Sequence, residues 1–101
     1  MKQILLLLAI FVLTGLQAQT PEQRLEELGI TLPEFSKPAA NYVKWRRTGN
    51  LLFLAGDGSV AKGKLGKDLT VEEGYQAARM TGIEILATLK AACGELSNIK
   101  Q

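Results

Sequence analysis

The spacing of apolar positions along the chain predicts a β-hairpin. The stretch from Tyr42 to Arg47 mixes apolar and basic residues, whereas Leu51 to Ala55 is apolar at every position. Gly49 and Asn50 between them suit a tight turn, because both residue types tolerate positive φ. A strand that is apolar on both faces must be covered on both. The long helix predicted downstream can cover one face, so we expect the other to meet further chain or another subunit.

The same analysis predicts a long helix from Val71 to Cys93, about 34 Å at the standard rise per residue. Thr70 and Glu73 stand at the positions of a capping box, and Gly94 is a natural stop. Apolar and small residues form one helical stripe, namely Val71, Tyr75, Ala78, Gly82, Ile85, Leu86, Leu89, Ala92 and Cys93. The stripe predicts a helix that packs on the sheet, with Ala78 and Gly82 allowing a close approach.

Shorter elements flank this pair. Thr20-Pro21-Glu22-Gln23 combines an N-cap, a proline at the first helical position and a capping-box glutamine, so a short helix is predicted that ends near Gly29. Two prolines keep the segment from Ile30 to Ala40 extended or irregular, and we expect this arm to pack across the sheet. The segment from Leu96 to Gln101 is predicted to lead into a third strand.

Residues 1–18 have the layout of a secretory signal peptide. Lys2 supplies the basic start, Ile4 to Leu13 forms a short apolar core, and Ala18 is a small residue at the expected cut. The apolar run is short for a membrane span, and a retained N-terminal anchor is the alternative. The pattern predicts a secreted or periplasmic protein with no membrane contact after cleavage, and a single partial domain at residues 19–101.

The net charge argues against a nucleic-acid partner. The formal charge is +2, with 12 basic and 10 acidic residues, and loss of Lys2 with the signal peptide lowers it to +1. Lys44, Arg46 and Arg47 cluster on the first predicted strand, where basic residues usually face solvent or protect a sheet edge. A phosphate or carboxylate site is the alternative for this cluster.

Cys93 is the one cysteine, and the chain has no histidine. An internal disulfide and a Ser-His-Asp triad are therefore excluded, and a zinc site is disfavoured. Because Cys93 falls on the apolar stripe without a histidine to act as its base, we expect a packed thiol. Gly58 to Lys64 fits the first seven positions of a phosphate-binding P-loop, but Leu65 stands where Ser or Thr should hold magnesium. We expect a mobile surface loop there.

Two segments together carry a resemblance to a known family. Tyr42-Val43 leads a basic strand into Gly49-Asn50, an apolar strand and the step Gly56-Asp57, while the loop from Gly63 to Thr70 feeds the helix start from Val71 to Arg79. This arrangement resembles the N-terminal half of the RidA (YjgF) family domain, also labelled endoribonuclease L-PSP or chorismate-mutase-like. The resemblance implies an α+β, chorismate-mutase-like fold of short helix, β-hairpin, long helix packed on the sheet and the start of a third strand. We expect a fragment of a longer reading frame, because this is a small core.

The resemblance also implies an activity, the hydrolysis of reactive enamine or imine intermediates to keto acids and ammonia in clefts between the subunits of a homotrimer. It implies a small carboxylate-bearing ligand held by an arginine, a water positioned by a glutamate, and no metal or organic cofactor. Tyr42 matches the family's cleft tyrosine, with a sheet-packing aromatic as the alternative. We predict substrate contact at Tyr42, Ala55 and Gly56 and assign no catalytic residue.

The chain departs from the family at two positions. Ala55 stands where the deaminase branch has a serine, which removes a hydroxyl, and Asp57 replaces the usual glutamine. The carboxylate-binding arginine, its neighbouring cysteine and the late glutamate would fall beyond Gln101, and Arg46 and Arg47 are not at the matching position. Three alternatives to a deaminase stay open: an exported non-catalytic ligand-binding or assembly member, the endoribonuclease of the family label, and a protein-interaction module.

Overall fold

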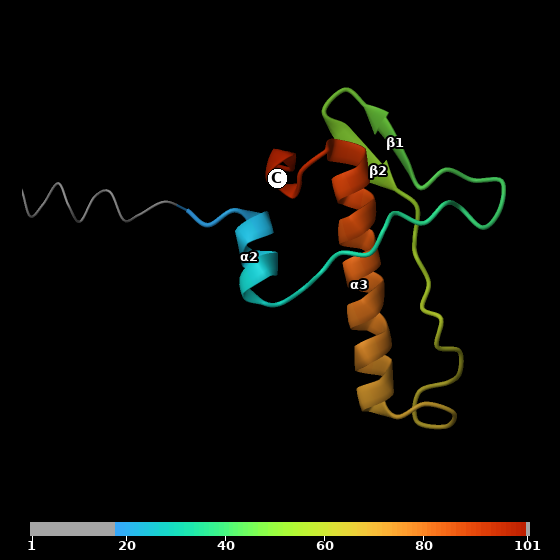
Figure 1. Cartoon of the computed structure of the whole chain (residues 1–101). Coiled ribbons are helices and arrows are strands. Elements are labelled where there is room, and N and C mark those ends of the chain that lie inside the picture. Colours follow the sequence, from blue (N-terminus) through green and yellow to red (C-terminus); the bar gives the residue numbers. More distant parts are fainter. Residues whose placement is uncertain (1–17, 101) are drawn as a thin grey trace, which may run out of the picture.

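The computed structural model describes residues 18–100. Its elements along the chain are α2 (Pro21–Glu27), β1 (Trp45–Thr48), β2 (Leu51–Leu54), α3 (Val71–Cys93) and the 3-10 helix η1 (Leu96–Asn98). The strands form an antiparallel hairpin near the C-terminal half of α3, and the arm, residues 30–40, crosses the same helix (Figure 1). The predicted α+β architecture is confirmed. Apart from its last residue, the predicted signal peptide lies outside the described residues, and no described helix has the length and hydropathy needed to cross a bilayer.

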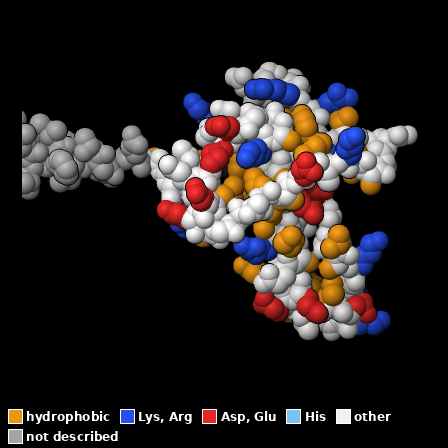
Figure 2. All heavy atoms as spheres, in the orientation of Figure 1, with side chains coloured by type: hydrophobic (Ala, Val, Ile, Leu, Met, Phe, Trp, Pro, Cys, Tyr) orange, Lys and Arg blue, Asp and Glu red, His pale blue; other side chains and the backbone are white. Residues whose placement is uncertain are grey.

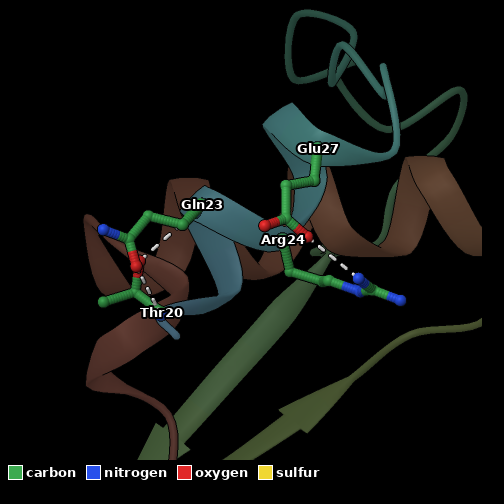
Figure 3. A network of polar contacts seen from close by, with 4 residues as sticks. All are labelled: Thr20, Gln23, Arg24 and Glu27. Atoms are coloured by element: carbon green, nitrogen blue, oxygen red, sulfur yellow. Dashed lines mark hydrogen bonds and ion pairs between the residues drawn. The ribbon is translucent and has the colours of Figure 1, made fainter. Parts of the chain in front are cut away.

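Helix α2 begins and ends where the sequence predicts. The Thr20 hydroxyl accepts the backbone N–H of Gln23 at 3.2 Å, and the Gln23 side chain accepts the backbone N–H of Thr20 at 3.0 Å (Figure 3). An exposed ion pair of 2.9 Å joins Arg24 to Glu27 one turn along the same helix. Gly29 follows the helix with φ of 63°, a conformation that glycine adopts without strain. Local hydrogen bonds therefore fix both ends of α2.

The chain from Leu96 forms η1 instead of the predicted lead into a third strand. The Glu22 carboxylate accepts the backbone N–H groups of Leu96 at 2.6 Å and of Ser97 at 3.2 Å. The N–H of Ile99 donates to the carbonyl of Leu96 at 3.0 Å, which closes the 3-10 turn. Because these N–H groups are already used, residues 96–98 cannot pair as a strand. Glu22 thus ties α2 to the end of the described chain.

The hydrogen bonds also change the ionisation of Glu22. Burial raises its pKa, but hydrogen bonds from the backbone N–H groups of Glu22 itself, Ser97 and Leu96, together with the charge of Lys90, lower it more. The net pKa therefore lies below the ordinary value. The charged form of Glu22 is the one that holds α2 and η1 together.

The hairpin has the turn position that the sequence predicts. Thr48 pairs with Leu51, so Gly49 and Asn50 are the two turn residues. Gly49 has φ of 56°, and no non-glycine residue among 18–100 has positive φ, so only the first turn residue takes the left-handed conformation. This is the type II′ pattern, in which the second position needs no positive φ. Asn50 therefore does not use the positive φ that its residue type tolerates.

One face of the hairpin turns toward α3, and the other is open. Leu52 and Leu54 line a pocket with Leu89 and Cys93 of α3, so this face turns toward the helix. Side chains alternate along a strand, and the opposite face of β2 carries Leu51 and Phe53, which are 63% and 59% exposed. The expectation that α3 covers one face of the apolar strand is met in part, because Leu52 is half-buried while Leu54 is still 37% exposed. The second face is free among the described residues.

Helix α3 has the predicted bounds but buries a different set of residues. Its capping box at Thr70 and Glu73 and its end at Gly94 are confirmed. The buried side chains are Ile83, Ala87 and Thr88, all in the C-terminal half. Val71 and Tyr75 at the start of the predicted stripe are 78% and 62% exposed, and Gly82 has no atom near its Cα that would require a glycine. The stripe is exposed in the N-terminal half, because the hairpin and the arm both lie along the C-terminal half (Figure 1). In the C-terminal half its residues are half-buried, and the three buried side chains lie off the predicted stripe.

The arm lies on α3 and reaches the sheet through one aromatic pair. Pro33 and Glu34 line a small pocket together with Ala87 of α3. The ring of Phe35 meets the ring of Trp45 edge-on, with ring centres 5.1 Å apart and planes 66° apart. The arm therefore links the helix to β1, whereas the sequence predicted that it would pack across the sheet.

The loop before α3 has more local structure than predicted. The carbonyl of Lys64 accepts the N–H groups of Lys67, Asp68 and Leu69 at 3.1, 2.8 and 3.2 Å, and the Asp68 carboxylate accepts the N–H of Lys64 at 2.9 Å. The side chain of Leu65 lies against Gly74 in the first turns of α3. The turn lies after Gly58–Lys64, for which a mobile loop is predicted, and the contact of Leu65 with Gly74 anchors it on the helix.

Candidate functional site

The open end of the hairpin brings the predicted substrate-contact segments side by side. The N–H of Ala55 donates to the carbonyl of Lys44 at 2.9 Å, which extends the strand pairing one step beyond β1 and β2. Tyr42 precedes this hydrogen bond on one segment, and Gly56 follows it on the other. Tyr42 is 43% exposed, Gly56 is exposed, and Ala55 is half-buried. The hairpin register thus places all three predicted residues at one end of the sheet.

A buried ion pair lies at the same end. The Lys44 ammonium is 2.5 Å from the Asp57 carboxylate, and the two side chains are 4% and 12% exposed. The hydrogen bond that Lys44 donates to Asp57 raises the pKa of Lys44, burial lowers it, and the charges of Asp57, Tyr42 and Glu84 raise it further, so the net pKa lies above its usual value. The prediction that Lys44 faces solvent was therefore wrong.

The three residues of the basic cluster, Lys44, Arg46 and Arg47, differ in exposure. Arg46 and Arg47 are exposed, as expected for cations on a sheet edge, while Lys44 is enclosed. Asp57, which departs from the family's glutamine, was the available signal for a buried cation in the sequence. A lysine taken out of water requires an anion as its partner.

The groups at this end of the hairpin suit hydrogen bonding to a small molecule. Tyr42 offers a hydroxyl that donates and accepts, and the peptide of Gly56 offers backbone groups without a covering side chain. Ala55 offers no hydroxyl. Lys44 is protonated and paired, so it does not supply a free amine for nucleophilic attack. Within residues 18–100, no three His, Cys, Asp or Glu side chains gather as a metal would require.

Cys93 lies away from this end, close to the C-terminus of α3. It is half-buried and lines the pocket that the helix shares with Leu52 and Leu54. Its carbonyl accepts the side-chain amide of Asn98 at 2.9 Å. These contacts agree with the predicted packed thiol.

A groove that the sequence did not predict runs between the loop and α3. It has a volume of about 410 Å³ and is bordered by Val60, Leu69 and Met80 together with Glu72, Glu73 and Glu84. Acidic and hydrophobic side chains gather at the end of the molecule where α3 begins (Figure 2). Hydrogen bonds from the backbone and then the hydroxyl of Thr70 lower the pKa of Glu73, outweighing burial, so this carboxylate is charged and already used as a cap. An acidic border does not suit a phosphate backbone.

Comparisons with known proteins agree in the family they indicate. Residues 22–101 match a family described as "YjgF/chorismate_mutase-like, putative endoribonuclease". The chain is 37% identical over 83 residues to "Protein TCP17" of Trypanosoma cruzi. This match covers 76% of this chain and 52% of that protein.

Two solved structures are similar to this chain as well. One is a "putative endoribonuclease" from Shewanella oneidensis, with 43% identity and a TM-score of 0.72 over 82% of this chain and 59% of that one. The other is the protein Atu1372 of unknown function from Agrobacterium tumefaciens, with 39% identity and a TM-score of 0.60 over 77% and 50%. The chain thus spans between 50% and 59% of the length of the relatives it matches.

Proposed function

Because this chain belongs to the YjgF/chorismate mutase-like family, we propose that the protein hydrolyses small enamine or imine acids to keto acids and ammonia. The supporting observation is the open end of the hairpin. The hydrogen bond from Ala55 to Lys44 brings Gly56 and the segment of Tyr42 to the same end of the sheet. We propose that Tyr42, Ala55 and Gly56 contact the substrate. The activity is proposed for the whole protein, since the chain spans about half the length of its relatives.

The chemistry sets what the site must supply. Water adds to the carbon of the C=N bond and gives a carbinolamine; its C–N bond then breaks, and the nitrogen leaves as ammonia after gaining a proton. Such a reaction needs a positioned water and a cation for the substrate carboxylate. The Tyr42 hydroxyl and the Gly56 backbone suit orientation of the substrate, whereas Lys44 is already paired with Asp57.

We further propose that a second copy of the chain completes the site, as part of a homotrimer. Leu51 and Phe53 support assembly, because two large apolar side chains more than half exposed on one sheet face favour burial against a partner. A neighbouring subunit could then bring an arginine to the carboxylate. The small carboxylate-bearing ligand would lie between subunits.

An endoribonuclease is the second candidate, favoured by the family's own description. Three features of this chain count against it: the formal charge of +2, the absence of histidine, and the acidic border of the groove beside α3. A non-catalytic ligand-binding member is also compatible with Ala55, which lacks the hydroxyl of a serine. We prefer the hydrolase because the described residues suit a small ligand better than a phosphate backbone.

A paired assay separates these functions. An enamine acid is generated in situ by a serine dehydratase, and keto acid formation is followed with and without the whole protein, while labelled RNA is incubated in parallel. We expect faster keto acid formation, and a loss of about tenfold in kcat/KM for Tyr42→Phe, the size of one lost hydrogen bond. Salt-sensitive RNA cleavage without enamine hydrolysis would overturn the proposal in favour of the ribonuclease. Binding of pyruvate without turnover would favour the non-catalytic member.

A further inference from the structure

Lys44 holds the segment after β2 at two points. Its carbonyl accepts the N–H of Ala55 at 2.9 Å, and its ammonium binds the Asp57 carboxylate at 2.5 Å. Gly56 lies between these two tethers. A single residue therefore fixes the chain on both sides of the exposed peptide that stands at the proposed substrate site.

The surroundings of Lys44 favour a positional role. The whole residue is 5% exposed, and its ammonium contacts Asp57 of the segment after β2. The charges of Asp57, of Tyr42 on its own segment and of Glu84 on α3 all raise its pKa. A buried ion pair adds little net stability compared with apolar residues of the same size, but loss of one partner leaves an unpaired buried charge. Loss of one partner should therefore destabilise the chain more than replacement of both partners by apolar residues.

We propose that Lys44 and Asp57 form a positioning pair that holds Ala55 and Gly56 at a fixed distance from Tyr42. The pair orients the substrate-contact peptide and does not itself touch the reacting atoms. It also explains a feature of this sequence: Asp57 stands where the resemblance gives a glutamine, because the enclosed Lys44 requires an anion there. The catalytic consequence rests on the proposed function, whereas the positioning itself does not.

The test uses the full chain and four variants: Lys44→Met, Asp57→Gln, the double variant with both changes, and Arg46→Met. The last removes an exposed cation from the same strand and serves as the matched control. The first readout is the set of amide resonances of Ala55 and Gly56 in ¹H–¹⁵N spectra. The second is kcat and KM for enamine hydrolysis.

We expect each single variant to move both amide resonances and to lower kcat by about ten- to hundredfold, since small displacements of a reacting group have effects of this size. The double variant should change both readouts no more than either single variant does, because each single change already breaks the pair, and Arg46→Met should leave both readouts unchanged. Should the single variants not fold, Asp57→Glu keeps both charges with a longer side chain and should shift the Gly56 resonance while keeping the chain folded.

The two proposals fail differently. If the wild-type protein does not hydrolyse enamines but the amide resonances move in the single variants and move no further in the double variant, the proposed function is wrong and the positioning pair stands. If the resonances of Ala55 and Gly56 stay in place in the single variants, or if the effects of the two changes simply add, the positioning pair is wrong whatever the activity.

Discussion

Two glycines inside α3 should respond oppositely to alanine. An alanine in a helix interior is more stable than glycine by about 0.8–1.0 kcal/mol. A Cβ at Gly82 would meet no atom within 4 Å, so Gly82→Ala should gain this full amount. A Cβ at Gly74 would overlap the Cδ2 atom of Leu65 and lie 3.3 Å from its Cδ1 and 3.4 Å from its Cγ. The same substitution therefore meets open space at one position and a packed side chain at the other.

The overlap sets the size of the effect. Overpacking of this kind costs about 1–3 kcal/mol, and the lower part of that range applies because Leu65 is 59% exposed and can rotate outward. Gly74→Ala should thus be neutral or destabilising by about 1 kcal/mol, which leaves it about 1–2 kcal/mol less stable than Gly82→Ala. The cause of this difference in stability would be the lost contact between Leu65 of the loop and α3.

Urea unfolding followed by circular dichroism measures both variants, alone and together with Leu65→Ala. With Leu65 shortened, the obstacle at Gly74 is gone, so both alanines should stabilise the chain by about 1 kcal/mol. If Gly74→Ala stabilises as much as Gly82→Ala while Leu65 is intact, Leu65 does not pack against the helix and the reasoning fails.

Two further predictions concern the hairpin turn and acid stability. Gly49→Ala should destabilise the chain by about 1–2 kcal/mol in the same urea assay, because an alanine at φ of 56° is strained. Gly58→Ala is the control, since Gly58 has no positive φ and an added Cβ would meet no atom within 4 Å. The pKa of Glu22 lies below the ordinary value of 4.5, so its stabilising contribution is present above that pH and is lost as pH falls through the lower folded-state value. Glu22→Gln should therefore lose less stability than the wild type between about pH 5 and about pH 3, and equal losses would contradict the role given to Glu22.

The features that the sequence predicts correctly depend on neighbouring residues. The capping boxes at Thr20 and Thr70 join residues three positions apart, so the pattern alone contains both partners. The hairpin turn at Gly49 is equally local. Because the turn sets the register, the meeting of the segments that carry Tyr42 and Ala55 could also be predicted before the structure was known.

The features that the sequence misses depend on distant residues. The N–H of Leu96 finds its acceptor in Glu22, 74 residues earlier, and no local pattern shows that this removes it from a strand. Lys44 is buried because Asp57, 13 residues later, faces it. The apolar stripe of α3 predicts neither the length nor the side of the helix that is most buried, because the arm covers Ala87, which lies off the stripe.

A titration of the full chain with pyruvate, followed by amide resonances, tests the proposed site most directly. A small keto acid carries the carboxylate and carbonyl of the proposed product. We expect the largest and saturable shifts at Tyr42, Ala55 and Gly56, and a weaker response in Tyr42→Phe. Shifts confined to the exposed Arg46 and Arg47, or no saturable shifts at concentrations where the wild type hydrolyses enamines, would contradict a substrate site at the open end of the hairpin.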